Sequence, residues 1–109
     1  MENYQIIFYS TPQGNVKVEV FFEEETFWLS QKRIADLFSV DVRTINEHLQ
    51  NIYSTGELQK DSTIRKFRIV ENEGGRDVDF YNFDVIIAAG YRVNSYQTIK
   101  EMKSIYIKQ

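Results

Sequence analysis

The sequence contains no cysteine, and it has only one histidine, one tryptophan and one proline among its 109 residues. Without cysteine there can be no disulfide bonds or thiolate metal ligands, and this composition is typical of a reducing compartment. A metal site needs several ligands, so the single histidine, His48, does not predict one. We therefore expect no metal and no other cofactor, and we interpret His48 as a packing or surface residue.

Long apolar segments are also absent. No run approaches the roughly 18 apolar residues of a transmembrane helix. The N-terminal residues have neither the basic start nor the apolar stretch of a signal peptide. We expect a cytoplasmic protein with no membrane segment.

The features of an enzyme site are missing as well. The sequence shows no phosphate-binding glycine loop, no metal-ligand spacing and no nucleophile beside a base. We therefore predict no catalytic residues and no enzymatic activity.

Charge is nearly balanced overall, with 13 basic and 16 acidic side chains and a net charge of −3. Indiscriminate binding to nucleic acid needs many cations, so this total disfavours it. Residues 30–68 differ from the rest, because they carry seven basic and five acidic side chains. Residues 1–29 carry one basic and five acidic side chains. A small basic excess thus coincides with the segment that holds the clearest motif.

That motif, residues 30–49, has the pattern of two short helices joined by a tight turn. Apolar residues recur at helical spacing in both halves. Ser30 and Asp41 are suitable N-caps, and Ser39 stands where such turns often have glycine because they favour a positive φ. The small Ala35 permits close approach of a crossing helix. The spacing predicts a helix-turn-helix, whose second helix enters the DNA major groove, although an ordinary helical hairpin can show it too.

The second of these helices should run from Val42 to about Thr55, with Gly56 as its C-terminal stop. Its buried stripe should consist of Val42, Ile45, Leu49 and Ile52. The other face carries side chains that suit base edges, since Arg suits guanine, Asn and Gln suit adenine, and Glu accepts from cytosine. We predict base contacts from Arg43, Thr44, Asn46, Glu47 and Gln50. A merely solvated helix face would look similar.

Two β-hairpins flank this unit. Residues 4–9 and 16–22 are rich in β-formers and are separated by Thr-Pro-Gln-Gly-Asn, a turn by composition. Residues 64–71 and 76–81 are separated by Asn-Glu-Gly-Gly, which suits a tight hairpin. A hairpin directly after a helix-turn-helix is the wing of a winged-helix domain, so the predicted fold class is α+β.

Polar and basic side chains at the start of the first helix and on the wing are candidates for phosphate contacts. They are the polar Gln31 and the basic Lys32, Arg33, Arg65, Lys66 and Arg68. Arg76 is a further wing cation. The alternative is that the wing cations pair across the strands with Glu71, Asp77 and Asp79.

The remaining segments are interpreted as structural. The acidic run 23–25 should form a solvated turn away from any DNA, and Trp28 should staple onto the first turn of the helix that follows. Residues 84–89 should form a short buried helix ended by Gly90, although a buried strand would also suit them. Residues 96–107 have the spacing of an amphipathic helix, with Ile99, Met102 and Tyr106 on one face.

Several of these segments resemble the virulence RhuM family of bacteria. The resemblance lies in WLSQ at residues 28–31, IADLF at 34–38, INEHLQNIYSTGEL at 45–58 and FYNFDVIIAAGYRVNS at 80–95. It implies a DNA-binding-like domain that is often carried on mobile elements. Family members continue into a longer helical region, from which this chain departs after Ser95.

Taken together, the sequence predicts one winged helix-turn-helix domain over residues 1–95, with residues 96–109 as its helical extension. We expect it to bind double-stranded DNA, as a transcriptional regulator or a mobile-element accessory protein. The C-terminal helix or the hairpin edges would supply a homodimer contact. The alternative function is a protein-interaction module on the same scaffold, which the acidic total favours.

Overall fold

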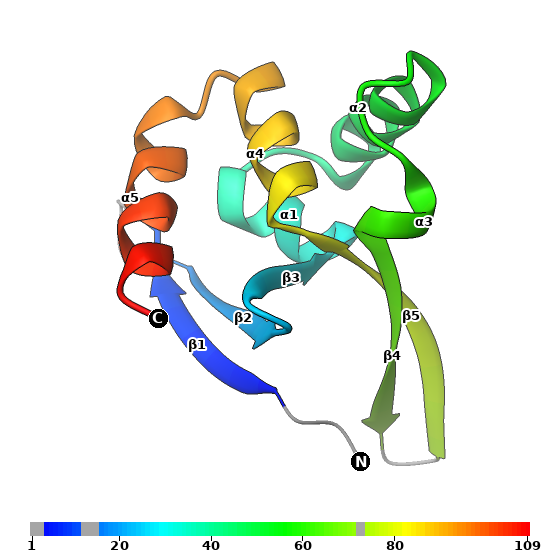
Figure 1. Ribbon diagram of the computed structural model, residues 1–109, viewed down its shortest axis with the longest axis vertical. Helices are drawn as coiled ribbons and strands as arrows, with labels where there is room; N and C mark the ends of the chain where they lie inside the picture. Colours follow the sequence, from blue (N-terminus) through cyan, green and yellow to red (C-terminus); the bar gives the residue numbers. More distant parts are fainter. Residues whose placement is uncertain (1–3, 12–15, 72–73) are drawn as a thin grey trace.

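One antiparallel sheet with strand order β1-β2-β3-β5-β4 underlies the fold in the computed structural model, which describes residues 4–11, 16–71 and 74–109 (Figure 1). The described strands are β1 (Gln5–Ser10), β2 (Lys17–Glu23), β3 (Thr26–Ser30), β4 (Ile64–Glu71) and β5 (Gly74–Asn82). The described helices are α1 (Gln31–Phe38), α2 (Val42–Ser54), α3 (Lys60–Thr63), α4 (Phe83–Arg92) and α5 (Tyr96–Ile107). The chain therefore has the predicted α+β class. No described helix combines the length and apolarity needed to cross a membrane.

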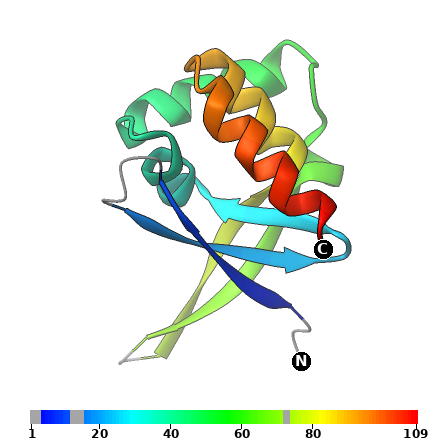
Figure 2. The ribbon, with the colours of Figure 1, turned by 90° about the vertical axis from the view of Figure 1, so that its left-hand side faces the viewer.

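The helices gather on one side of the sheet, and the β4–β5 hairpin extends beyond them as a long arm (Figures 1 and 2). The main core lies between the sheet and helices α1, α2, α4 and α5. Ile99 and Met102 of α5 are buried in it, at 3% and 1% exposure. The C-terminal helix is thus packed into the same core as the helix-turn-helix segment.

The predicted N-terminal hairpin is confirmed, since β1 and β2 pair antiparallel with Ile7 opposite Val20. Residues 12–15 of its predicted turn lie outside the described residues. Strand β3 was not predicted, because Phe27, Trp28 and Leu29 are all buried and show no alternation. β3 joins the two hairpins into one sheet by pairing with both β2 and β5.

The staple predicted for Trp28 is wrong. Its indole lies on the other side of the sheet from the main core, in an outer aromatic cluster formed by Phe21, Trp28, Phe67 and Phe80. The indole Nε1 donates a hydrogen bond of 3.0 Å to the carbonyl oxygen of Glu23. Because Trp28 is in a strand, its side chain points away from the face on which Phe27 and Leu29 enter the helical core.

The second predicted hairpin is also confirmed. β4 pairs antiparallel with β5 over its whole length, with Phe67 opposite Val78, while residues 72–73 of the turn lie outside the described residues. The one-turn helix α3 precedes β4 and was not predicted. The hydroxyl of Thr63, the last residue of α3, shares a 2.8 Å hydrogen bond with the hydroxyl of Tyr53, and this bond connects α3 to α2.

The helix predicted over residues 84–89 is confirmed, but the role of Gly90 is not. Gly90 lies inside α4, which continues to Arg92. A Cβ on Gly90 would lie 2.7 Å from Ile99 Cδ1 and 2.8 Å from Phe38 Cζ. The glycine is therefore present because α4 passes close to α5 and α1, and not as a stop signal. The last helix, residues 96–107, has the predicted bounds.

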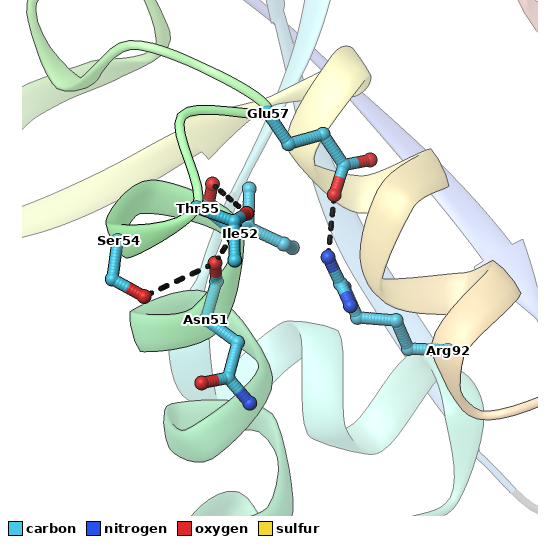
Figure 3. Close-up of polar contacts among 6 residues, drawn as sticks. All are labelled: Asn51, Ile52, Ser54, Thr55, Glu57 and Arg92. Carbon is cyan, nitrogen blue, oxygen red and sulfur yellow. Dashed lines mark hydrogen bonds and ion pairs between the residues drawn. The ribbon is translucent and has the colours of Figure 1, made fainter.

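Backbone hydrogen bonds cap the C-terminus of α2, and the prediction that Gly56 ends this helix is confirmed. Gly56 has φ +79°, and the amides of Gly56 and Glu57 donate to the carbonyls of Tyr53 and Ile52. This is the Schellman arrangement, in which a left-handed residue ends a helix. The hydroxyl of Thr55 also donates to the Asn51 carbonyl, at 2.8 Å (Figure 3). Helix α2 therefore has a sharply defined end.

Candidate nucleic-acid interface

Helices α1 and α2 are the two helices joined by a tight turn that the sequence predicts. The Ser30 hydroxyl accepts a 3.2 Å hydrogen bond from the Arg33 amide at the start of α1. The Asp41 carboxylate accepts one of 3.1 Å from the Arg43 amide at the start of α2. Both sequence-predicted N-caps are confirmed, and they fix where each helix begins.

The turn between the helices has a positive φ at Ser39, of 57°. The amide of Val40 donates to the Ala35 carbonyl at 3.0 Å, and that of Ser39 to the Asp36 carbonyl at 3.3 Å. Serine thus occupies a left-handed position that favours glycine. The turn keeps its geometry despite the unfavourable residue.

The inner faces of the two helices are buried, with one exception. Ile45, Leu49 and Ile52 are at most 4% exposed. Val42, predicted to belong to this stripe, is 41% exposed. Its position in the first turn of α2 lies where the helix leaves the core, so the prediction for Val42 is wrong and the apolar stripe is one turn shorter.

The five predicted base contacts all lie on the first three turns of α2. Arg43, Glu47 and Gln50 are exposed, whereas Thr44 and Asn46 are partly buried. Within the described part of the chain, the Arg43 guanidinium takes part in no ion pair. Its charge is therefore available to a ligand.

A groove of about 500 Å³ separates α2 from the base of the β4–β5 hairpin. Asn46 and Gln50 line one wall, and Asp79 and Tyr81 of β5 line the other. The fold thus brings two of the predicted base contacts to face the predicted wing.

A second groove, of about 560 Å³, lies between the N-terminus of α1 and β5. Three of the predicted phosphate contacts line it, namely Gln31, Lys32 and Arg33, and Arg76 lies on the opposite wall. The Gln31 amide nitrogen also donates to the Val42 carbonyl, at 3.3 Å. Both grooves share Asp79 and Tyr81, so they are neighbours along β5.

The two cations of α1 already have carboxylate partners. Lys32 lies 3.7 Å from Asp36, and its side chain is 80% exposed. Arg33 lies 3.3 Å from Glu19 of β2 and 5.1 Å above the ring of Phe21. Arg33 is therefore held against the sheet, whereas Lys32 is only loosely held.

Arg65 is bound by the acidic run that the sequence placed away from DNA. Its guanidinium lies 3.1 Å from Glu23 and 3.0 Å from Glu24. The Glu23 side chain is only 10% exposed, so the prediction that residues 23–25 are simply a solvated turn is wrong for Glu23. Glu24 and Glu25 do form a turn, with φ values of 54° and 62°.

Lys66 and Arg68, two other cations of the predicted wing, pair across the hairpin, which confirms the alternative for them. Lys66 Nζ lies 2.7 Å from Asp79, and Arg68 Nη1 lies 3.3 Å from Asp77. The hydrogen bond to Asp79 raises the pKa of the Lys66 ammonium. Both cations are more than half exposed, so water screens these ion pairs and they contribute little to stability.

Sequence reasoning missed Lys60 and Tyr53 as groove residues. Both line the groove beside α2, and Lys60 Nζ lies 5.9 Å from the ring centroid of Tyr53. Burial raises the pKa of the Tyr53 hydroxyl, which also contacts Thr63. The sequence offered little to find them by, apart from a lysine soon after the predicted helix stop at Gly56. The position of Lys60 beside α2 depends on α3, which was not predicted.

No known protein family, curated protein or solved structure matches this chain. Among the described residues, His, Asp and Glu side chains form no group of three that would hold a metal ion. The candidate interface therefore rests on its own geometry.

Proposed function

We propose that this chain binds double-stranded DNA through α2, as a winged helix-turn-helix domain. The observation that carries the proposal is the two-sided character of α2. Its inner face is fixed in the core by Ile45, Leu49 and Ile52, and its outer face presents a free arginine with Asn46 and Gln50. A helix of this kind, rigidly held and rich in bidentate side chains, suits the major groove.

The β4–β5 hairpin supports the winged assignment. It follows α1 and α2 after the one-turn helix α3, it pairs with β3, and it extends beyond the helices on the side of α2 and α3 (Figure 1). In a DNA complex, this hairpin would contact the backbone beside the groove that α2 enters. The RhuM resemblance agrees with this proposal and stays a prediction, as does a cytoplasmic location.

Phosphate binding would require the wing cations to exchange partners. Lys66 and Arg68 are held by single exposed carboxylates, and solvent screening makes such pairs weak, so each exchange would cost little free energy. Asp77 and Asp79 would then face the phosphates and repel them. We therefore expect a single domain to bind DNA weakly, with Arg43 as the available cation of α2.

A protein partner is the second candidate function. Carboxylates interrupt the basic surface at Asp41, Glu47, Asp77 and Asp79, and such alternating charge is less suited to a phosphate backbone than to a protein surface. On this alternative the same grooves would bind a peptide or a protein loop.

The test is selection from a random duplex pool, followed by affinity measurements on the enriched sequence. Replacing Arg43→Ala together with Asn46→Ala should abolish sequence preference and weaken binding at least tenfold. The control variant, Lys100→Ala with Gln97→Ala, removes the same charge and a similar amide from α5, so it should bind like wild type. Absence of any enriched sequence at low salt would contradict the proposal and favour the protein partner.

A further inference from the structure

Strand β1 is an unprotected edge of the sheet. Among the described strands it pairs with β2 alone, and Figure 2 shows it at the front of the sheet with no described helix over its outer edge. Two apolar side chains on this strand are exposed, Ile6 at 45% and Phe8 at 58%. An exposed apolar edge strand has unpaired backbone N–H and C=O groups and readily pairs with another strand, so most proteins cover such an edge or place charged residues on it.

The opposite edge strand, β4, carries charged side chains that disfavour pairing with another strand. β4 carries Arg65, Lys66 and Arg68, all of which are engaged in ion pairs, whereas residues 5–10 of β1 contain no charged side chain. Charged edge strands resist additional pairing. A head-to-tail contact of β1 with β4 of another copy is therefore disfavoured, and the uncharged β1 is its own best match.

The exposed residues of β1 continue an apolar surface that is already packed within the chain. Ile6 lies opposite Phe21 of β2, and Phe21 belongs to the outer aromatic cluster with Trp28, Phe67 and Phe80. Residues directly opposite in an antiparallel pair share a face. The outer apolar surface thus reaches the edge of the sheet at Ile6. Phe8 lies on the same face of β1, opposite Glu19, with Lys17 Nζ 5.9 Å from its ring centroid.

We infer that β1 pairs antiparallel with β1 of a second copy, forming a two-fold dimer with a continuous sheet. A two-fold axis normal to the sheet keeps the outer faces of both copies on the same side. Even-numbered residues of one β1 then lie opposite even-numbered residues of the other, and odd-numbered opposite odd-numbered. The register centred on Ile7 sets Ile6 of each copy opposite Phe8 of the other. In this register Ile6 and Phe8 of both copies, four exposed apolar side chains in all, pack against one another. The inference does not depend on DNA binding.

Sedimentation velocity tests the association. Wild-type protein at tens of micromolar should sediment as a dimer, with twice the 12.9 kDa mass of the chain. Replacing Ile6→Lys and Phe8→Lys sets like charges opposite each other across the axis and should weaken dimerisation at least tenfold. The control Tyr96→Lys with Ile107→Lys adds the same charges at the exposed residues of α5 and should leave the dimer intact.

Cysteine cross-linking tests the register, because the chain has no cysteine of its own. Directly opposite residues have Cα separations that a disulfide spans. The double variant Ile6→Cys with Phe8→Cys should therefore form covalent dimers on mild oxidation, and Ile6→Cys alone should not.

Three results would overturn the inference. One is a monomer at all concentrations. Another is a dimer that the two lysine substitutions on β1 leave unchanged, and the third is a failure of the double-cysteine variant to cross-link. If the lysine variant unfolds, as judged by circular dichroism, the cross-linking result decides.

Discussion

Arg92, in the last turn of α4, donates a 2.5 Å hydrogen bond to the carboxylate of Glu57, just beyond the end of α2 (Figure 3). Residues 51–58 and residues 90–93, which are far apart in the sequence, therefore meet through this pair. It links the C-terminal end of α2 to α4. The position of α2, and with it the proposed interface, depends partly on this contact.

Breaking that pair should have a small effect on stability. The side chains of Arg92 and Glu57 are 30% and 46% exposed, and pairs at such exposure stabilise by about 0.5–1 kcal/mol. Arg92→Ala and Glu57→Ala should each lower the free energy of unfolding by about that amount in urea titrations. The double variant should lose less than the sum of the two, and strict additivity would show that the side chains do not interact in solution.

Replacing Ser39→Gly should stabilise the protein. Ser39 is exposed and has φ 57°, and a left-handed conformation costs a residue with a Cβ about 1–2 kcal/mol. We expect a gain of about 1 kcal/mol in the free energy of unfolding, reduced from that range by the greater freedom of glycine in the unfolded chain. The matched control is Ser54→Gly at the end of α2, which should instead destabilise by about 0.5 kcal/mol. A loss of stability in Ser39→Gly would contradict the turn geometry.

Gly90→Ala should destabilise the protein by about 1–3 kcal/mol, since the new methyl group overlaps Ile99 and Phe38. Thermal unfolding followed by circular dichroism measures the loss. Shortening one neighbour tests the cause, because Ile99→Ala makes room for the methyl group. Gly90→Ala should therefore cost less in the Ile99→Ala background than in wild type, and an equal cost in both would point to another origin.

The Tyr9–Glu101 hydrogen bond should make stability depend on pH. The Tyr9 hydroxyl, followed by Gln97, lowers the pKa of the Glu101 carboxyl below its ordinary value of 4.5. A carboxyl whose pKa is lower in the folded state stabilises that state above its unfolded pKa, and the contribution is lost as pH falls through the folded pKa. Tyr9→Phe should therefore lower stability at pH 7 by about 1 kcal/mol and by less at pH 3. A pH-independent difference between Tyr9→Phe and wild type would contradict this account.

Alkaline pH should weaken the same contact. Burial, and then Glu101, raises the pKa of the Tyr9 hydroxyl above its ordinary value of 10.0. The folded state then holds the phenolic proton more tightly than the unfolded state. Its contribution to stability is complete below pH 10 and declines as pH rises above it. Urea titrations between pH 8 and 11 should show a steeper decline for wild type than for Tyr9→Phe, and parallel curves would contradict the assignment.

The capping signals in the sequence were reliable, whereas features that depend on contacts between distant segments were not predicted. Ser30, Asp41 and Gly56 act through bonds within a few residues, so their capping roles could be predicted. Strand β3 could not, because both of its faces are buried and its sequence has no alternating pattern. Gly90 was interpreted as a helix end because its packing partner Ile99 lies on another helix.

The candidate site shows the same division. Helical periodicity alone places Arg43, Asn46 and Gln50 on one side of α2. The partners of the cations on the β4–β5 hairpin depend on tertiary structure. This is clearest for Arg65, whose partners Glu23 and Glu24 lie at the end of β2 and in the turn that follows it. The grooves along β5 required the fold, since their walls come from α1, α2 and the hairpin.

The most direct test of the central claim is an NMR titration of isotopically labelled protein with a duplex enriched by selection. If α2 reads DNA, amide shifts should change over residues 42–50 and along the β4–β5 hairpin, while β1 and α5 stay largely unchanged. Raising the salt concentration should reverse these changes. An absence of shifts at low salt, or shifts confined to β1 and α5, would contradict DNA recognition by α2.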